Sequence, residues 1–143
     1  MSVSLDDNRG FTLPHKVSDL MKLPQIDLSN SSLHGKMPAS FGQLTALVDL
    51  ELYLNRLTGS IPPSVSQLKS LRSLQLQRNE MSGSLPAEIG ALSSLERLYL
   101  YRNHFAGLIP VNIGQLTKLK ELSLYANNFA GVARWQRRFR VAS

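Results

Sequence analysis

The sequence repeats itself every 24 residues, and this period constrains the fold more than any other feature. Each repeat starts at a leucine: Leu23, Leu47, Leu71, Leu95 and Leu119. Four full repeats and the first half of a fifth fill residues 23–131. Self-similarity at such a period is typical of a solenoid, in which each unit buries its apolar residues by stacking on its neighbours. We therefore predict one domain of stacked repeats.

Within a repeat, apolar residues recur at positions 1, 4, 6, 11, 15, 19 and 22, as in the third repeat: Leu71, Leu74, Leu76, Met81, Leu85, Ile89 and Leu92. Positions 4 and 6 alternate with polar residues, which indicates a short strand with one buried face. Positions 15, 19 and 22 surround a proline at position 16, which indicates about one helical or 3₁₀ turn. The predicted fold class is α/β, a solenoid with a parallel β-sheet on its concave face and short helical or 3₁₀ turns on its convex side.

Position 9 carries an asparagine in the second to fifth repeats: Asn55, Asn79, Asn103 and Asn127. A buried amide has two donor hydrogens and an acceptor oxygen, so it can bridge backbone groups where the chain leaves the strand. We interpret these residues as a structural asparagine ladder rather than as catalytic or ligand-binding residues. Ser31 replaces the asparagine in the first repeat, where we expect the ladder to weaken. The glycines at position 13 are interpreted as backbone turns, since a 24-residue spacing excludes a local phosphate-binding loop.

The pattern LxxLxLxxNxLxGxIP is closely followed by Leu47–Pro62 and Leu95–Pro110. It resembles the repeat of the leucine-rich-repeat family, specifically its plant-type GxIP class. Similar repeats build the ectodomains of plant receptor-like kinases and receptor-like proteins, and the secreted polygalacturonase inhibitors. The resemblance implies a right-handed solenoid that recognises a protein or peptide ligand in receptor-type signalling or defence. A structural scaffold within an assembly, or an inhibitor docking on a secreted enzyme, are the alternatives.

The two ends depart from the repeat. Residues 1–22 contain only a half-repeat, Leu13–Lys22, which either caps the first strand or is the remnant of a truncated repeat. Residues 132–143 form a basic tail or cap, in which Trp135, Phe139 and Ala142 have the spacing of a short helix over the open end of the core. An unstructured end and an arginine and aromatic patch for nucleic acid or an anionic membrane are the other interpretations of this tail.

We predict that positions 2, 3, 5, 7 and 8 of each repeat are strand positions whose side chains point outward and form rows across the concave face. We call this surface the sheet face. All four tyrosines lie on it, together with several arginines, and these two residue types are the most enriched in interface hot spots. The alternative is a solvated surface where aromatic residues serve cross-strand packing. The predicted partner-binding residues are Glu51, Tyr53, Arg72, Arg78, Arg97, Tyr99, Tyr101, Arg102 and Tyr125.

Charge on the sheet face is expected to be bipolar. Asp27, Asp49 and Glu51 lie in the first two repeats, and the arginines Arg72, Arg78, Arg97 and Arg102 lie in the next two. Such a face would orient a peptide or an acidic partner along the stack.

Composition argues against several other functions. The formal net charge is +6, but four arginines after residue 131 contribute most of it, so a nucleic-acid partner is not favoured. The chain has no cysteine, its three histidines lie far apart in sequence, and no Ser/His/Asp set or carboxylate pair projects from the repeat. We therefore predict no catalytic activity, no metal site and no cofactor; the oligomeric state stays open.

No signal peptide and no run of about 20 apolar residues is recognisable. This predicts a cytoplasmic chain by default, or an extracellular or plasma-membrane one if the chain is part of a receptor ectodomain. Asn30-Ser31-Ser32 is the only N-glycosylation sequon, and it matters only in the secretory route. Without a signal peptide, we interpret this sequon as a chance occurrence.

Overall fold

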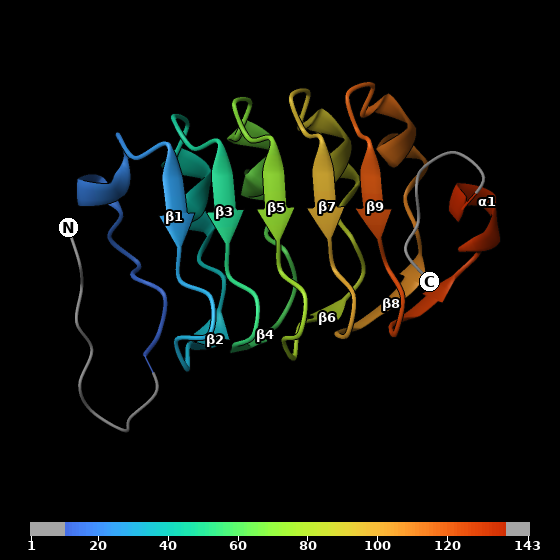
Figure 1. The fold of residues 1–143 in the computed structure, drawn as a ribbon, viewed down its shortest axis with the longest axis horizontal. Coiled ribbons are helices and arrows are strands. Elements are labelled where there is room, and N and C mark those ends of the chain that lie inside the picture. Colours follow the sequence, from blue (N-terminus) through green and yellow to red (C-terminus); the bar gives the residue numbers. More distant parts are fainter. Residues whose placement is uncertain (1–10, 137–143) are drawn as a thin grey trace.

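The computed structural model of the chain describes residues 11–136. Its main feature is a parallel five-stranded sheet that receives one strand from each repeat (Figure 1). Identical repeat positions are in register, so that Ile26 lies opposite Leu50, and Leu50 opposite Leu74. The strands follow in sequence order: β1 (Gln25–Asp27), β3 (Asp49–Glu51), β5 (Ser73–Gln75), β7 (Arg97–Tyr99) and β9 (Glu121–Ser123). The predicted solenoid of stacked strands and tight turns is confirmed.

A 3₁₀ helix follows the proline at position 16 in each of the first four repeats. Proline fixes φ near the helical value and lacks the N–H that the start of a helix leaves unsatisfied, so it suits this point of the chain. Neighbouring helices pack closely, since a Cβ added at Gly90 would lie 2.3 Å from the Asn112 carbonyl oxygen. The helices are η2 (Ala39–Gln43), η3 (Pro63–Gln67), η4 (Ala87–Ala91) and η5 (Val111–Gln115).

A second row of short parallel strands lies between the main sheet and the 3₁₀ helices, and the sequence did not predict it. These strands contain the glycines at position 13 or end directly before them, and the φ of these glycines is positive, as at Gly35 (83°) and Gly107 (79°). A segment with a glycine at its centre lacks the alternation by which strands are recognised. One pair joins β2 (His34–Lys36) to β4 (Arg56–Thr58), and a three-stranded sheet joins β6 (Ser82–Gly83), β8 (His104–Leu108) and β10 (Asn128–Ala130).

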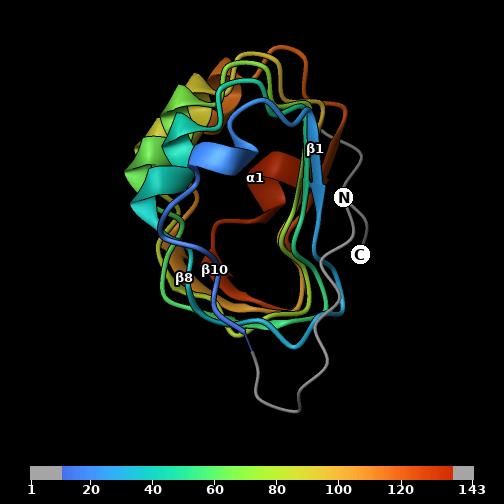
Figure 2. The same ribbon diagram turned by 90° about the vertical axis from the view of Figure 1, so that its left-hand side faces the viewer.

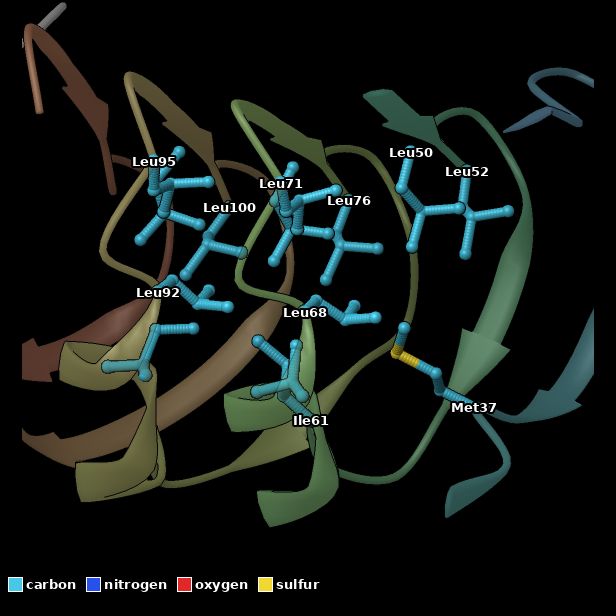
Figure 3. Packing of buried hydrophobic residues seen from close by; sticks show 14 of the residues in the cluster. Met37, Leu50, Leu52, Ile61, Leu68, Leu71, Leu76, Leu92, Leu95 and Leu100 are labelled. Atoms are coloured by element: carbon cyan, nitrogen blue, oxygen red, sulfur yellow. The ribbon is translucent and has the colours of Figure 1, made fainter. Parts of the chain in front are cut away.

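The apolar core fills the space enclosed by these three sides. Viewed from one end, the main sheet and the 3₁₀ helices lie on opposite sides, with β8 and β10 along a third (Figure 2). Leu71 and Leu76 of the third repeat project toward Leu68, which lies just after η3 (Figure 3). All three are fully buried. Close packing of equivalent leucines therefore joins each repeat to the next.

Two features of the core depart from the aliphatic repeat pattern. Leu23, at position 1 of the first repeat, is 41% exposed, because no preceding repeat with a strand covers it. The core is also not purely aliphatic, since the rings of Phe41 and Phe105 are buried within it. Position 11 thus accepts a phenylalanine as well as a leucine or methionine.

Both ends of the core are covered by non-repeat residues. Leu13 and Val17 are buried beside η1 (Ser18–Leu20) at one end of the stack. At the other end, α1 (Ala133–Gln136) places Trp135 in the core with 5% exposure (Figures 1 and 2). Phe139 and Ala142, which the sequence placed on the same helix, lie outside the described residues.

The sheet face as candidate binding site

The strands of the main sheet are shorter than expected. They end at position 5, so the tyrosines at position 7 and the arginines at position 8 lie in the bends that follow. The prediction that these side chains belong to the strands was wrong. The physical reason is the backbone at position 8, which is left-handed in every repeat: Asn30, Leu54, Arg78, Arg102 and Ala126, with φ between 51° and 57°.

The asparagines at position 9 hold these bends in place. The side-chain oxygen of Asn103 accepts a hydrogen bond from the Met81 N–H (3.0 Å) in the preceding repeat. Its amide nitrogen donates to the carbonyl oxygens of Leu76 (3.0 Å) and Leu100 (3.1 Å). Asn79 makes the equivalent three bonds, and the Leu76 carbonyl accepts from both asparagines. Asn55 and Asn127 repeat the pattern, so a continuous row of amides connects the second to the fifth repeat.

Ser31 does not take the place of an asparagine in this row. Its hydroxyl donates to the Ser29 carbonyl oxygen of its own repeat (3.0 Å). The bend of the first repeat is instead held by Asn55, whose side-chain oxygen accepts from the N–H groups of Ser31 (2.9 Å) and Leu33 (3.0 Å).

Two of the predicted tyrosines form a stacked pair on the sheet face. The rings of Tyr101 and Tyr125 have centroids 4.5 Å apart and are inclined by only 9°. Both side chains are partly exposed. Tyr53 is separated from Tyr101 by the third repeat, where Gln77 occupies position 7 and is buried at 6% exposure. The structure therefore brings Tyr101 and Tyr125 together and leaves Tyr53 apart.

Tyr99 is engaged within the sheet face. Its hydroxyl donates to the carboxylate of Glu121 on the neighbouring strand. Burial, followed by this hydrogen bond and the charge of Glu121, raises the pKa of Tyr99 to about 12. Glu121 was not among the predicted site residues. This contact could have been predicted from the repeat, because β7 and β9 are adjacent and a long acidic side chain at position 3 can reach position 5 of the neighbouring strand.

Ion pairs occupy some of the predicted charges. A guanidinium nitrogen of Arg97 lies 3.8 Å from the carboxylate of Asp49, two repeats away, across Ser73, which is fully buried. Lys120 approaches Glu96 to 2.6 Å and lowers the pKa of that carboxyl by hydrogen bonding. Within residues 11–136, Arg78 and Arg102 are exposed and make no ion pair. Arg72 is likewise exposed and in no ion pair there, so three of the four predicted arginines are open to a partner.

The acidic residues of the first two repeats also lie near one another. Burial raises the pKa of Glu51, and the negative charges of Asp27 and Asp49 raise it further. The guanidinium of Arg97 acts in the opposite direction. Arg72 is exposed near Glu96, at the edge where the strands begin. The sheet face thus has a group of acidic residues in its first two repeats. Arg97, in the fourth repeat, reaches toward this group and pairs with Asp49.

Other kinds of site are not found in the described part of the chain. No three His, Asp or Glu side chains among residues 11–136 lie close enough to hold a metal ion. None of the helices described there is long and apolar enough to cross a membrane.

Comparison with known families places the chain. The family described as Leucine rich repeat matches residues 21–81, and a second family of the same description matches residues 94–116. Together these stretches span more than half of the sequence. The chain belongs to the leucine-rich-repeat family. A comparison with curated protein sequences gave no match.

Solved structures with the same fold include plant receptor ectodomains. The ectodomain of the membrane receptor kinase GASSHO1/SCHENGEN3 from Arabidopsis thaliana, solved in complex with CASPARIAN STRIP INTEGRITY FACTOR 2, is 39% identical, with a TM-score of 0.81 over 86% of this chain. The plant peptide hormone receptor RGFR1, in complex with RGF2, is 35% identical, with a TM-score of 0.81 over 84%. The ectodomain of the Arabidopsis receptor kinase HAESA, in complex with an IDA peptide hormone, is 36% identical, with a TM-score of 0.78 over 85%. This chain spans only 15%, 19% and 20% of those three proteins.

Proposed function

We propose that the sheet face binds a peptide or protein segment, and that the chain serves ligand recognition in receptor-type signalling or defence. The observation that carries this proposal is the stacked pair of Tyr101 and Tyr125, whose backbone carbonyl oxygens accept hydrogen bonds from the N–H groups of Arg78 and Arg102. Tyrosine and arginine combine a large contact area with directed hydrogen bonds, which is why they dominate interface hot spots.

The conformation and pairing of these four residues support the proposal. The tyrosine rings already stack on each other, so a ligand that covers them has little side-chain motion left to arrest. The two arginines have no ion pair within the described residues, so a ligand carboxylate need not displace an internal partner. A carboxylate and a guanidinium form a strong, charge-assisted pair of hydrogen bonds.

The relatives support the same class of function. RGFR1 is a plant peptide hormone receptor whose structure was solved in complex with RGF2, and the HAESA ectodomain was solved in complex with an IDA peptide hormone. Since this chain spans a fifth or less of those proteins, their particular ligands do not transfer to it. The ligand that we propose is therefore a class, an extended peptide or protein segment with an acidic group.

The test begins with a random linear peptide library displayed on phage and selected against the full chain. Enriched peptides are synthesised, and their affinity is measured by calorimetry for the wild type and for the double variant Tyr101→Ala/Arg102→Ala. Loss of two hot-spot residues should weaken binding by about 30-fold or more. The control variant Glu88→Ala/Gln115→Ala removes two exposed side chains of η4 and η5 and should bind as the wild type does. Equal affinity of the wild type and the tyrosine–arginine variant would overturn the proposal, provided that circular dichroism shows both to be folded.

A scaffold function is the second candidate, and one observation favours it. Leu108 and Val111 are 74% and 66% exposed on β8 and η5, away from the sheet face. The preceding repeat has Ser84 and Ala87 at these positions. Loss of peptide binding in a Leu108→Ser/Val111→Ser variant, with binding kept in the tyrosine–arginine variant, would favour contact through this second surface.

A further inference from the structure

The sequon Asn30-Ser31-Ser32 lies on the surface, in the bend after β1. Asn30 and Ser32 are both exposed, and both have a left-handed backbone, with φ of 51° and 54°. This exposure distinguishes Asn30 from the ladder asparagines such as Asn79, whose amide is buried and bonded to three backbone groups.

The bend does not depend on the side chain of Asn30. The Asn30 N–H donates to the Tyr53 carbonyl oxygen (2.9 Å). The side-chain oxygen of Asn55 accepts from the N–H groups of Ser31 and Leu33, which follow Asn30 in the chain. Among residues 11–136, the side-chain amide of Asn30 has no hydrogen-bond partner. The same position holds Leu54 in the second repeat and Ala126 in the fifth, so the fold tolerates very different side chains there.

From this placement we propose that Asn30 is an N-glycosylation site. In the reaction, the side-chain nitrogen Nδ2 of Asn30 attacks C1 of the first sugar of a lipid-diphosphate-linked oligosaccharide. The Nδ2–C1 bond forms, the bond from C1 to the diphosphate oxygen breaks, Nδ2 gives up one proton to a base of the transferase, and the lipid diphosphate leaves. The hydroxyl of Ser32 supplies the third residue that the acceptor sequence requires.

The inference rests on the receptor-type part of the proposed function, because ectodomains enter the secretory route in which this transfer takes place. It does not depend on which ligand the sheet face binds. It replaces the interpretation of the sequon as a chance occurrence, which was based on the lack of a recognisable signal peptide.

The position of Asn30 also determines at which end of the sheet face a glycan would be attached. Asn30 occupies the same row as Arg78 and Arg102, but at the end of the stack where Asp27 and Glu51 lie. Strands are spaced by about 4.8 Å, so Tyr101 lies roughly 14 Å along the stack from the glycan attachment site. The attachment site therefore lies at the acidic end of the sheet face and not beside the tyrosine pair.

The experiment expresses the full chain behind a cleavable secretion signal in a eukaryotic cell and measures the intact mass of the secreted protein. The wild type should carry an N-linked glycan, which a peptide N-glycosidase removes with conversion of residue 30 into aspartate. Asn30→Gln and Ser32→Ala should both abolish the added mass, the second without changing the acceptor residue. Ser31→Ala is the matched control, because it keeps the sequon and should stay glycosylated.

A folded, secreted wild type with the mass of the bare polypeptide would overturn the inference, as would a glycan that persists in Asn30→Gln. The result is independent of the peptide-selection experiment on the sheet face. An unglycosylated chain that still binds peptides would refute only the inference about Asn30. A glycosylated chain that binds none would refute only the proposed ligand recognition.

Discussion

Repeats 4 and 5 contain two pairs of stacked aromatic rings, and the pairs lie on opposite sides of the same backbone. Phe105 and Phe129, at position 11, stack inside the solenoid with centroids 5.9 Å apart and an inclination of 9°. Tyr101 and Tyr125, at position 7, stack on the sheet face with the same inclination. Phe105 is fully buried and Phe129 packs against the core while partly buried, whereas both tyrosines are partly exposed on the sheet face.

The difference separates positions that the fold requires from positions whose side chains are free to serve the proposed binding. Position 11 is apolar in all five repeats, because its side chain replaces contact with water by contact with the core. Position 7 holds Ser29, Tyr53, Gln77 and then two tyrosines, so the repeat itself does not require an aromatic residue there. Stacking on the sheet face is therefore a property of this particular chain, and its energetic contribution to folding should be small.

The largest expected effect separates the two pairs directly. Phe105→Ala removes a fully buried ring and should lower the free energy of unfolding by about 3–5 kcal/mol. Tyr101→Ala removes a partly exposed ring from the same repeat and should lower it by about 1 kcal/mol. Urea denaturation followed by circular dichroism measures both. Similar losses for the two variants would contradict the division between an interior pair and a recognition pair.

The second effect concerns the asparagine ladder, which bonds the backbone of each repeat to the next at positions 6 and 11. Asn103→Ala would leave the buried Met81 N–H without an acceptor and should lower the free energy of unfolding by about 1–3 kcal/mol. The matched control is Asn128→Ala, in which an exposed asparagine of β10 is removed and the change should stay within about 0.5 kcal/mol. An equal loss in the two variants, again by urea denaturation, would mean that the ladder contributes no more than a surface amide.

These contrasts also define what could be predicted from the sequence. The buried residues at positions 4 and 6, the 3₁₀ turn after proline and the amide at position 9 recur at a fixed period. Because stacked repeats bury the same positions, that period shows which residues are buried. The outward side chains of the sheet face do not repeat at this period. Its tyrosine pair and its ion pairs therefore depend on which residues neighbouring repeats place side by side. The pairing of Arg97 with Asp49 across the small Ser73 is one example, since three rows of the sheet decide it together.

The left-handed bends at position 8 could not be predicted for a different reason. The usual signal for positive φ is glycine, and this position instead holds Asn30, Leu54, Arg78, Arg102 and Ala126. The bend is imposed by bonds from other residues, as when the Arg102 N–H donates to the Tyr125 carbonyl oxygen (3.0 Å). Tertiary contacts thus hold a backbone conformation that the local sequence disfavours.

This strain gives a third and smaller prediction. Leu54 adopts a φ of 57°, which disfavours a side chain with a Cβ by about 1–2 kcal/mol. Leu54→Gly relieves that strain but loses chain entropy on folding, so the free energy of unfolding should rise by up to about 1 kcal/mol. The control Arg56→Gly lies in β4, where φ is not positive, and should lower it by roughly 0.5–1 kcal/mol. Changes of the same sign in the two variants would show that the bend at Leu54 is not strained.

The smallest effect distinguishes Tyr99 from the stacked pair on the same face. Its phenol is neutral and bonded to Glu121 in the folded chain, with a pKa of about 12, whereas a tyrosine in an unfolded chain ionises near 10. The stabilisation from this neutral phenol is therefore fully present below about pH 10 and is lost as the pH rises toward 12. The difference in tyrosinate absorbance between the wild type and Tyr99→Phe isolates this one ionisation.

In a Glu121→Gln background the same difference should move to lower pH, because the carboxylate that favours the neutral phenol is gone. An unchanged midpoint, with the fold checked by circular dichroism at each pH, would show that burial alone governs Tyr99 and that Glu121 is free to meet a ligand.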